Sequence, residues 1–278
     1  MENVGASAEK AKQEAKPWVE RLARLGYSAR GIVYITIGWL AILAAMGRGG
    51  ETTGSGGALQ TIAQQPLGTF LLIVIAVGLV GYAIWRLVQG VSDPEHEGTD
   101  AEGIAKRIGY VGSGLAYGGL ALTAIGILRG TSNGGSQDSS AENATQTLMA
   151  QPFGQWLVGI AGGVVITVGL IALYIAYKEK FRDRLKLEEM SSTEVTWATR
   201  AGKMGYAARG IVYGIIGIFL INAALQADPN EARGLDGALQ TLAQQPYGPW
   251  LLGIVALGLV AFGVYSFVEA RYRLIRVE

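Results

Sequence analysis

The sequence predicts an all-α integral membrane protein whose six transmembrane helices form three parallel helical-hairpin repeats with pseudo-threefold symmetry. Two observations carry this prediction. Half of the 278 residues are hydrophobic, and six apolar runs of about 20 residues carry few charges, enough to cross a bilayer core. In addition, one pair of short motifs occurs three times along the chain. A soluble protein of this length has no room to bury six such runs.

The apolar runs give the expected spans, and the motifs group them into repeats. Each repeat contains two spans, so all three enter the membrane from the same side. Parallel repeats of this kind are related by an axis along the membrane normal. The expected spans are 27–46, 67–88, 108–128, 153–177, 204–225 and 247–268. The expected units are an N-terminal segment 1–20 and the repeats 21–90, 104–180 and 200–272.

The first motif lies at the start of each odd-numbered span. It contains a glycine–tyrosine pair, then arginine and glycine, then a second tyrosine. The tyrosines and the arginine are spaced i, i+3 and i+7, so they share one face of a helix. The resulting polar stripe consists of Tyr27, Arg30 and Tyr34, then Tyr110, Ser113 and Tyr117, then Tyr206, Arg209 and Tyr213.

Two interpretations of the polar stripe are open. Three stripes around an axis would line a cytoplasmic vestibule that attracts an anion, although Ser113 leaves one third of that ring uncharged. In the other interpretation, which we favour, the arginines extend to lipid headgroups or to a carboxylate such as Glu269. The tyrosines then belong to the aromatic belt of the interface.

The second motif precedes each even-numbered span. It consists of Gln64-Gln65-Pro66-Leu67-Gly68 in repeat one and recurs at 150–154 and 244–248. The residues that lead to its proline, such as 57–65, predict a short amphipathic helix in the membrane interface, which the proline ends. Its glutamines either ring an outer pore mouth or satisfy backbone groups at the break, which we favour because water is scarce there. The candidate residues are Gln60, Gln64, Gln65 and Pro66, then Gln146, Gln151 and Pro152, then Gln240, Gln244, Gln245 and Pro246.

Glycine pairs in the spans predict close helix contacts. Spacing of the Gly-x-x-x-Gly type lets two helix backbones approach each other in a membrane. The pairs begin at Gly114, Gly159 and Gly210, and we expect them to act within one chain rather than between chains.

The distribution of basic residues predicts the orientation. Of the 23 lysine and arginine residues, only Arg48, Arg129 and Arg233 lie in the three loops that follow odd-numbered spans. Cytoplasmic loops carry the excess of basic residues in membrane proteins. We therefore expect both termini in the cytoplasm.

The spans lack the residues that coupled transport or catalysis needs. The middle of each span carries no Asp, Glu, Lys or His, which argues against an ion-coupled pump. The chain has no cysteine, and its one histidine lies in the acidic loop 92–100, which we expect to be solvated rather than metal-binding. We expect no enzyme activity and no cofactor. Aliphatic runs such as 71–80 and 254–261 predict an axis closed by apolar side chains near the midplane.

The two motifs, repeated over residues 21–272, resemble the bacterial membrane family called domain of unknown function 1206. The resemblance implies a multi-pass protein of the bacterial inner membrane, built of three two-helix repeats. The family brings no established activity, so no functional residue is transferred through it. Ser113 and Ala150 depart from the repeated pattern, which argues against strictly threefold function.

Two functions follow from these observations. The sequence favours a non-catalytic scaffold or accessory protein that sits in the lipid bilayer and binds a membrane or cytoplasmic protein partner. The alternative is a passive channel or transporter of a small or lipid-like solute, along the repeat axis or through lateral grooves. The net charge of +1 gives no attraction to nucleic acid, so no such partner is expected.

Overall fold

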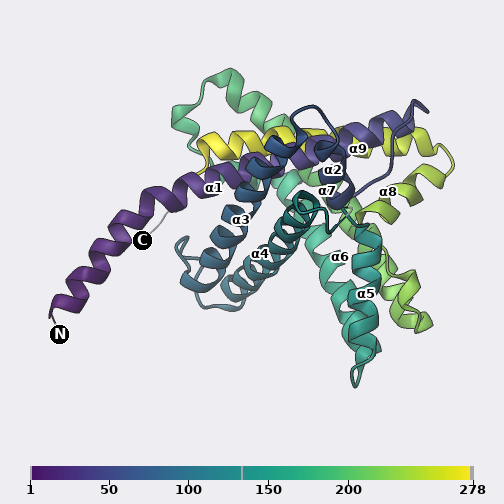
Figure 1. Cartoon of the computed structure of the whole chain (residues 1–278), viewed down its shortest axis with the longest axis horizontal. Coiled ribbons are helices and arrows are strands. Elements are labelled where there is room, and N and C mark those ends of the chain that lie inside the picture. The colour runs from purple at the N-terminus through teal and green to yellow at the C-terminus, as the bar shows by residue number, and fades with distance from the viewer. Residues whose placement is uncertain (1, 133, 276–278) are drawn as a thin grey trace.

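The computed structural model describes residues 2–132 and 134–275, with side chains from residue 17 onward, so most of the expected N-terminal segment lies outside the described side chains. Among these residues the chain forms helices and no strands (Figure 1). Six helices are long and apolar enough to cross a membrane, which confirms the predicted class. The α-helices are α1 (Glu2–Ala45), α2 (Ser55–Ala63), α3 (Gly68–Ser92), α4 (Ala101–Leu128), α5 (Gln137–Met149), α6 (Gly154–Lys178), α7 (Ser192–Gln226), α8 (Leu235–Gln244) and α9 (Gly248–Tyr272).

The first span of each repeat begins earlier than its apolar run. Helices α4 and α7 start two to three turns upstream, where side chains cap their first amides. Asp100 accepts a hydrogen bond from the Gly103 amide at 3.0 Å, and Ser191 forms a capping box with Glu194. The caps allow polar first turns to continue the helix beyond the hydrophobic stretch.

The second motif forms the turn between a short helix and the next span. The residue after its proline has positive φ in all three repeats: 63° at Leu67, 61° at Phe153 and 63° at Tyr247. The glycine that follows closes the turn, with the Gly68 amide donating to the Gln65 carbonyl at 2.7 Å. The motif therefore forms a turn, held by main-chain hydrogen bonds, from which the even-numbered span starts.

The closest helix pairs join neighbouring repeats: α1 packs along α9, α3 along α4, and α6 along α7. The second glycine of the first motif lies at each crossing, where a Cβ atom would meet a carbonyl oxygen of the paired helix. The expected close contacts are present at Gly114 and Gly210, whereas Gly159 has only a loose neighbour. The Cβ-to-oxygen distances would be 2.9 Å from Gly31 to Gly263, 3.2 Å from Gly114 to Ala83 and 2.8 Å from Gly210 to Gly169.

We call the boundary between the two spans of one repeat a seam. Helix contacts close the seam in repeats one and three, and it is open in repeat two. In repeat one α1 packs on α3, with Gly26 against Tyr82, and in repeat three α7 packs on α9, with Gly205 against Phe262. In repeat two, α4 and α6 are not a packed pair, and among the described residues no atom beyond the adjoining turns of α4 lies within 4 Å of a Cβ built on Gly109. Figure 1 shows α3–α4 and α6–α7 as two arms diverging from α1 and α9.

Candidate functional site

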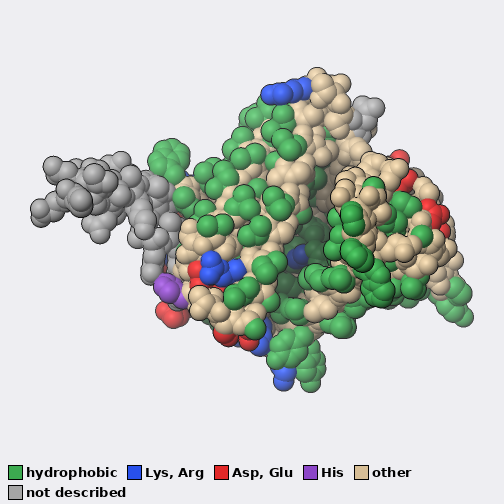
Figure 2. Space-filling model, turned by 90° about the horizontal axis from the view of Figure 1, so that it is seen from below, with side chains coloured by type: hydrophobic (Ala, Val, Ile, Leu, Met, Phe, Trp, Pro, Cys, Tyr) green, Lys and Arg blue, Asp and Glu red, His purple; other side chains and the backbone are tan. Residues whose placement is uncertain are grey.

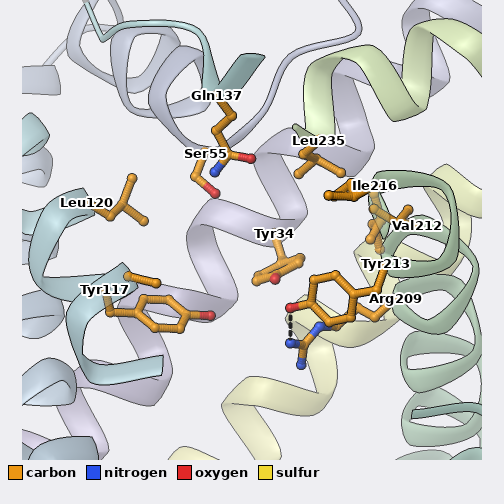
Figure 3. A pocket seen from close by; sticks show the side chains of 12 residues that line it. Tyr34, Ser55, Tyr117, Leu120, Gln137, Arg209, Val212, Tyr213, Ile216 and Leu235 are labelled. Atoms are coloured by element: carbon orange, nitrogen blue, oxygen red, sulfur yellow. Dashed lines mark hydrogen bonds between the residues drawn. The ribbon is translucent and has the colours of Figure 1, made fainter. Parts of the chain in front are cut away.

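A cavity of about 230 Å³ lies among α1, α4, α7 and α9 (Figure 3). The last tyrosine of the first motif from every repeat lines it: Tyr34, Tyr117 and Tyr213. At the other end, Ser55, Gln137 and Leu235 line it, and these are the first residues of α2, α5 and α8. Equivalent elements of the three repeats thus meet at one place, as expected for the repeat axis. The remaining lining residues are Ala116, Leu120, Arg209, Val212, Ile216 and Leu259.

The predicted apolar closure of the axis is wrong. Leu259, from the aliphatic run 254–261, lines this cavity instead of sealing the axis. The reason is the pairing of the helices. Each odd-numbered span packs tightly on the even-numbered span of another repeat, and short side chains such as Ala116 and Val212 leave the space between them unfilled.

Arg209 brings a positive charge to the cavity without a carboxylate partner. Its Nη2 donates a hydrogen bond to the Tyr213 hydroxyl, and its guanidinium carbon lies 4.4 Å from the ring centroid of Phe262 and 5.7 Å from that of Tyr34. Its Nε is buried and has no hydrogen-bond partner, and Arg209 forms no ion pair anywhere in the described part of the chain. A desolvated charge is costly unless it is paired, so the cavity is suited to an anion.

Arg30, the equivalent residue of repeat one, is fully paired. It forms an ion pair with Glu269 and donates to the Tyr82 hydroxyl at 2.6 Å and to Ser266 Oγ at 3.1 Å. The expected contact with Glu269 is therefore present. Extension toward lipid headgroups is not, because Arg30 and Glu269 are only 3% and 1% exposed.

The sequence of the even-numbered spans explains why the two arginines differ. Counted from the glycine of the second motif, Glu269 occupies the same position in its helix as Gln89 and Ile175. In the α1–α9 pair, Arg30 of α1 contacts Glu269 of α9. In the α7–α6 pair, which contains Arg209, the residue of α6 at the position of Glu269 is Ile175. The signal is present in the sequence itself, because aligning the three even-numbered spans brings Gln89, Ile175 and Glu269 into one column.

A buried network closes the end of the bundle next to Arg30. Glu269 also accepts from Arg273 Nη1 at 2.7 Å, and Arg273 Nη2 reaches Glu95 at 3.2 Å. Glu95 further accepts from Gln89 at 2.6 Å, and the neighbouring Glu97 forms an ion pair with Arg184 at 3.2 Å. Three carboxylates and several guanidinium groups thus lie across this end of the bundle.

The loop 92–100 belongs to this network, so the expectation that it is solvated is wrong for two of its residues. The side chains of Glu95 and Glu97 are largely buried. Burial alone would raise the pKa of Glu95, but Arg273, Arg184 and Arg86 outweigh it and hold that pKa below the ordinary glutamate value. Within the described residues, no group of three or more acidic or histidine side chains could hold a metal ion.

At the opposite end of the cavity, α5 and α8 each contribute a carboxylate that accepts hydrogen bonds from the start of the other helix. Asp236 of α8 accepts from the Gln137 amide at 2.8 Å and from the Ser136 hydroxyl, both at the start of α5. In return, Asp138 of α5 accepts from the Gly234 and Gly237 amides at 2.6 and 3.0 Å. Burial raises the pKa of Asp236 above the ordinary aspartate value, although these hydrogen bonds oppose the shift. Each carboxylate thereby satisfies helix amides of the other repeat.

A second pocket of about 650 Å³, called the outer pocket below, lies at the same end of the bundle as these carboxylates and includes Asp236 in its lining. Glu51, Gln60, Gln64 and Asp236 contribute to its lining, so it is more polar than the axial cavity. Thr53, Ser136 and Asp236 line this pocket, close in sequence to Ser55, Gln137 and Leu235 of the axial cavity, so the first turns of α2, α5 and α8 lie between the two spaces.

The remaining residues of the polar stripe point elsewhere. The Tyr27 ring meets the Tyr82 ring edge-on at 5.1 Å, Tyr110 donates to Glu97 at 2.8 Å, and Tyr206 stacks on Phe181 at 5.6 Å. Of the two tyrosines in each stripe, only the last lines the axial cavity, and Arg209 lines it with them. Ser113 does not contribute to the lining that the described residues form.

The glutamines of the second motif form neither a pore ring nor a backbone brace. None of them lines the axial cavity, and only Gln60 and Gln64 line the outer pocket. Main-chain hydrogen bonds close the turn instead, and Gln65 makes only one long bond, to the Thr61 carbonyl at 3.4 Å. The exposed residues of the set are Gln64, Gln65, Pro66, Gln146, Gln151, Pro152, Gln240, Gln244, Gln245 and Pro246.

Comparison with known proteins agrees with the repeat organisation. The family model "Domain of Unknown Function (DUF1206)" matches residues 25–93, 108–179 and 204–273. The chain is 39% identical over 264 residues to "Uncharacterized protein YxxB" of Bacillus subtilis (strain 168), covering 95% of this chain and 94% of the relative. No solved structure matches. With three matches that follow its three helical hairpins, the chain belongs to the DUF1206 family of multi-pass membrane proteins.

Proposed function

We propose that this protein is a membrane carrier that holds an anionic solute in its axial cavity. The observation that carries the proposal is Arg209, a guanidinium group without an ion pair in the described chain, which faces a cavity lined by three tyrosines. Arg209 is half-buried, and its guanidinium group offers several N–H donors at fixed angles, suited to a carboxylate or a phosphate. Binding and release involve no chemical step and no cofactor.

The two closures support a carrier rather than an open channel. The axial cavity lies between the network around Glu269 at one end and the Asp236–Asp138 exchange at the other. Both closures consist of hydrogen bonds and ion pairs between different repeats, and such contacts can be exchanged when helix pairs move relative to each other. A solute held between them would leave through whichever closure opens.

The orientation follows from the basic residues and the aromatic side chains. Exposed Trp18 and Trp197 mark the end where the basic connections lie, and exposed Phe70, Trp156 and Trp250 mark the opposite end. Tryptophan prefers both faces of a bilayer. We therefore infer a bacterial inner-membrane protein with both termini in the cytoplasm, and the Arg30–Glu269 network is then the inner closure.

The scaffold function that the sequence favours does not account for Arg209. A protein that only binds a partner through its outer surfaces has no use for an unpaired charge facing an internal cavity. That charge is costly to bury. Partner binding by the cytoplasmic segments would add to the carrier function and does not replace it.

The test is stabilisation by anions. The purified full-length protein is unfolded by heat with inorganic phosphate, glycerol phosphate or acetate, each at the same ionic strength. A ligand at 100 times its Kd stabilises the folded state by about 2.7 kcal/mol. We expect at least one anion to raise the unfolding temperature of the wild type and of Arg200→Gln, but not of Arg209→Gln. Arg200 is the control because it lies on the same helix and is exposed.

Equal behaviour of the two arginine variants would contradict the proposal. So would a wild-type protein that no anion in the series stabilises above the others. If Arg209→Gln is itself much less stable, Arg209→Lys provides the second variant, because it keeps the charge and loses the planar donor set.

A further inference from the structure

The open seam of repeat two gives the axial cavity a side entrance. We call the α4/α6 seam the space flanked by Gly109, Gly112 and Gly119 of α4 and by Val164 and Val168 of α6. Within the described residues, no atom beyond the adjoining turns of α4 lies within 4 Å of a Cβ built on any of the three glycines. Val164 and Val168 are 56% and 44% exposed. The residues at the same two positions of the other even-numbered spans are buried: Gly78 and Tyr82 of α3 pack on α1, and Gly258 and Phe262 of α9 pack on α7.

The seam and the cavity are connected through α4. Gly112 and Gly119 precede and follow Ala116 by four and three residues, so they lie on the same helix face as this cavity-lining residue. In Figure 2 the molecule is hollowed between two lobes, and atoms of a lysine or arginine side chain are visible deep in the hollow. A ligand can therefore reach the cavity from the side.

The size of the cavity limits what fits inside it. Its volume of about 230 Å³ is below the 300–1,000 Å³ typical of pockets that enclose a whole small-molecule ligand. A headgroup-sized anion fits, and any larger ligand must extend out through an opening. The α4/α6 seam is lined by glycine and valine, so the extending part must be apolar.

We propose that the ligand is an anionic phospholipid, whose phosphate binds at Arg209 and whose acyl chains leave through the α4/α6 seam. This inference rests on the proposed carrier function and narrows its substrate class. The phosphodiester of a phospholipid presents two charged oxygens, as a carboxylate does, and two ester oxygens besides. It therefore matches the Arg209 donors together with the hydroxyls of Tyr34, Tyr117 and Tyr213, which line the same cavity.

The α4/α6 seam also matches acyl chains in shape. Three glycines leave a smooth strip along α4, and the valines of α6 face it with short side chains. A partner helix would instead be expected to bring side chains or small residues into register with these glycines. The charge of Arg209 at the inner end of the entrance favours an anionic lipid over a neutral helix face.

The test is native mass spectrometry of the full-length protein in detergent, with equal amounts of dioleoylphosphatidylglycerol and dioleoylphosphatidylcholine. Both lipids carry a phosphodiester that Arg209 can bind, but phosphatidylcholine also carries a trimethylammonium group, which would bring a second positive charge close to Arg209. This repulsion should weaken binding of the zwitterionic lipid by about tenfold. We therefore expect the wild type to retain the anionic lipid about tenfold over the zwitterionic one. Arg209→Gln and Val168→Trp should abolish this preference, and Leu170→Trp should keep it. Leu170 is the matched control because it is exposed on the same helix, and two residues from Val168 it faces nearly the opposite side.

Each other outcome overturns the inference in a distinguishable way. If inorganic phosphate stabilises the wild type but not Arg209→Gln, while neither lipid is preferred, the carrier stands and its substrate is a free anion. If Val168→Trp retains lipid as Leu170→Trp does, the ligand does not use the α4/α6 seam. A dimer of the chain that Val168→Trp dissociates would show that a second copy covers it. Absence of both anion and lipid binding would refute the carrier as well.

Discussion

Replacing Glu269 by glutamine tests whether the inner closure holds the bundle together. Glu269 serves two guanidinium groups, those of Arg30 and Arg273, and all three side chains are almost completely buried. Removing one partner of a buried ion pair costs about 3–5 kcal/mol, because the remaining charge is left uncompensated. Here Arg30 keeps Tyr82, and Arg273 keeps Glu95 at 3.2 Å, so neither loses every partner. We expect Glu269→Gln to lower the free energy of unfolding by about 3–5 kcal/mol.

The measurement is unfolding of the purified protein in sodium dodecyl sulfate, followed by tryptophan fluorescence. The matched control is Glu189→Gln. Glu189 pairs with Lys186 at 2.9 Å, but it is 57% exposed, and exposed pairs contribute about 0–1 kcal/mol. If Glu269→Gln costs no more than Glu189→Gln, the inner network does not stabilise the bundle, and the argument from burial is wrong.

Three further predictions concern packing, topology and pH. Gly210→Val should destabilise the protein by about 1–3 kcal/mol in the same assay, because its Cβ would lie 2.8 Å from a carbonyl oxygen of α6. Gly214→Val is the control: its side chain would enter open space, so stability should change little. Because the chain has no cysteine, Ser139→Cys should react with an impermeant thiol reagent in intact cells and Ser191→Cys only after lysis; the reverse pattern would invert the orientation. Burial raises the pKa of the Asp236 carboxyl group in the folded state, so the folded protein is less stable when Asp236 is ionised than when it is protonated. Relative to Asp236→Asn, the wild type should therefore be most stable at low pH and lose that advantage as the pH rises through the raised pKa, and a constant difference would contradict the assignment.

The helical framework is predictable from the sequence because it follows from quantities that a single chain displays. Apolar length decides which segments cross the bilayer, and the repeated motifs decide how these segments are grouped. Even the glycines at the crossings carry a local signal, since Gly114 and Gly210 begin Gly-x-x-x-Gly pairs. These properties do not depend on which helices become neighbours.

The site depends on neighbours, which is why its prediction succeeds only in part. The shared face of Tyr27, Arg30 and Tyr34 follows from helical spacing, but the packing of the helices decides that Tyr27 contacts α3 within repeat one while Tyr34 faces the axis. The acidic loop is wrongly predicted to be solvated for the same reason: nothing local indicates that Arg184 and Arg273, far away in the sequence, lie beside Glu97 and Glu95.

Divergence of repeat two produces both features on which the proposed function rests. Its first span pairs with α3 and its second with α7, so a change in α6 affects the arginine of repeat three rather than its own Ser113. Ile175 leaves Arg209 unpaired, and Val168 leaves the α4/α6 seam open. A scaffold with three equivalent hairpins would gain nothing from these two departures, whereas a carrier needs both a free charge and an entrance to it.

The last prediction follows from this equivalence. Ile175→Glu places a carboxylate where Glu269 lies in the α1–α9 pair, and the α6–α7 pair has the same glycine crossing, at Gly169 and Gly210. The new carboxylate should pair with Arg209, as Glu269 pairs with Arg30, and compete with any external anion. We expect Ile175→Glu to fold, to lose stabilisation by anions and to lose preference for the anionic lipid, whereas Ile175→Gln, which adds polarity without charge, should keep both. If Ile175→Glu binds anions as the wild type does, Arg209 is not the group that binds them, and the proposed site must be abandoned.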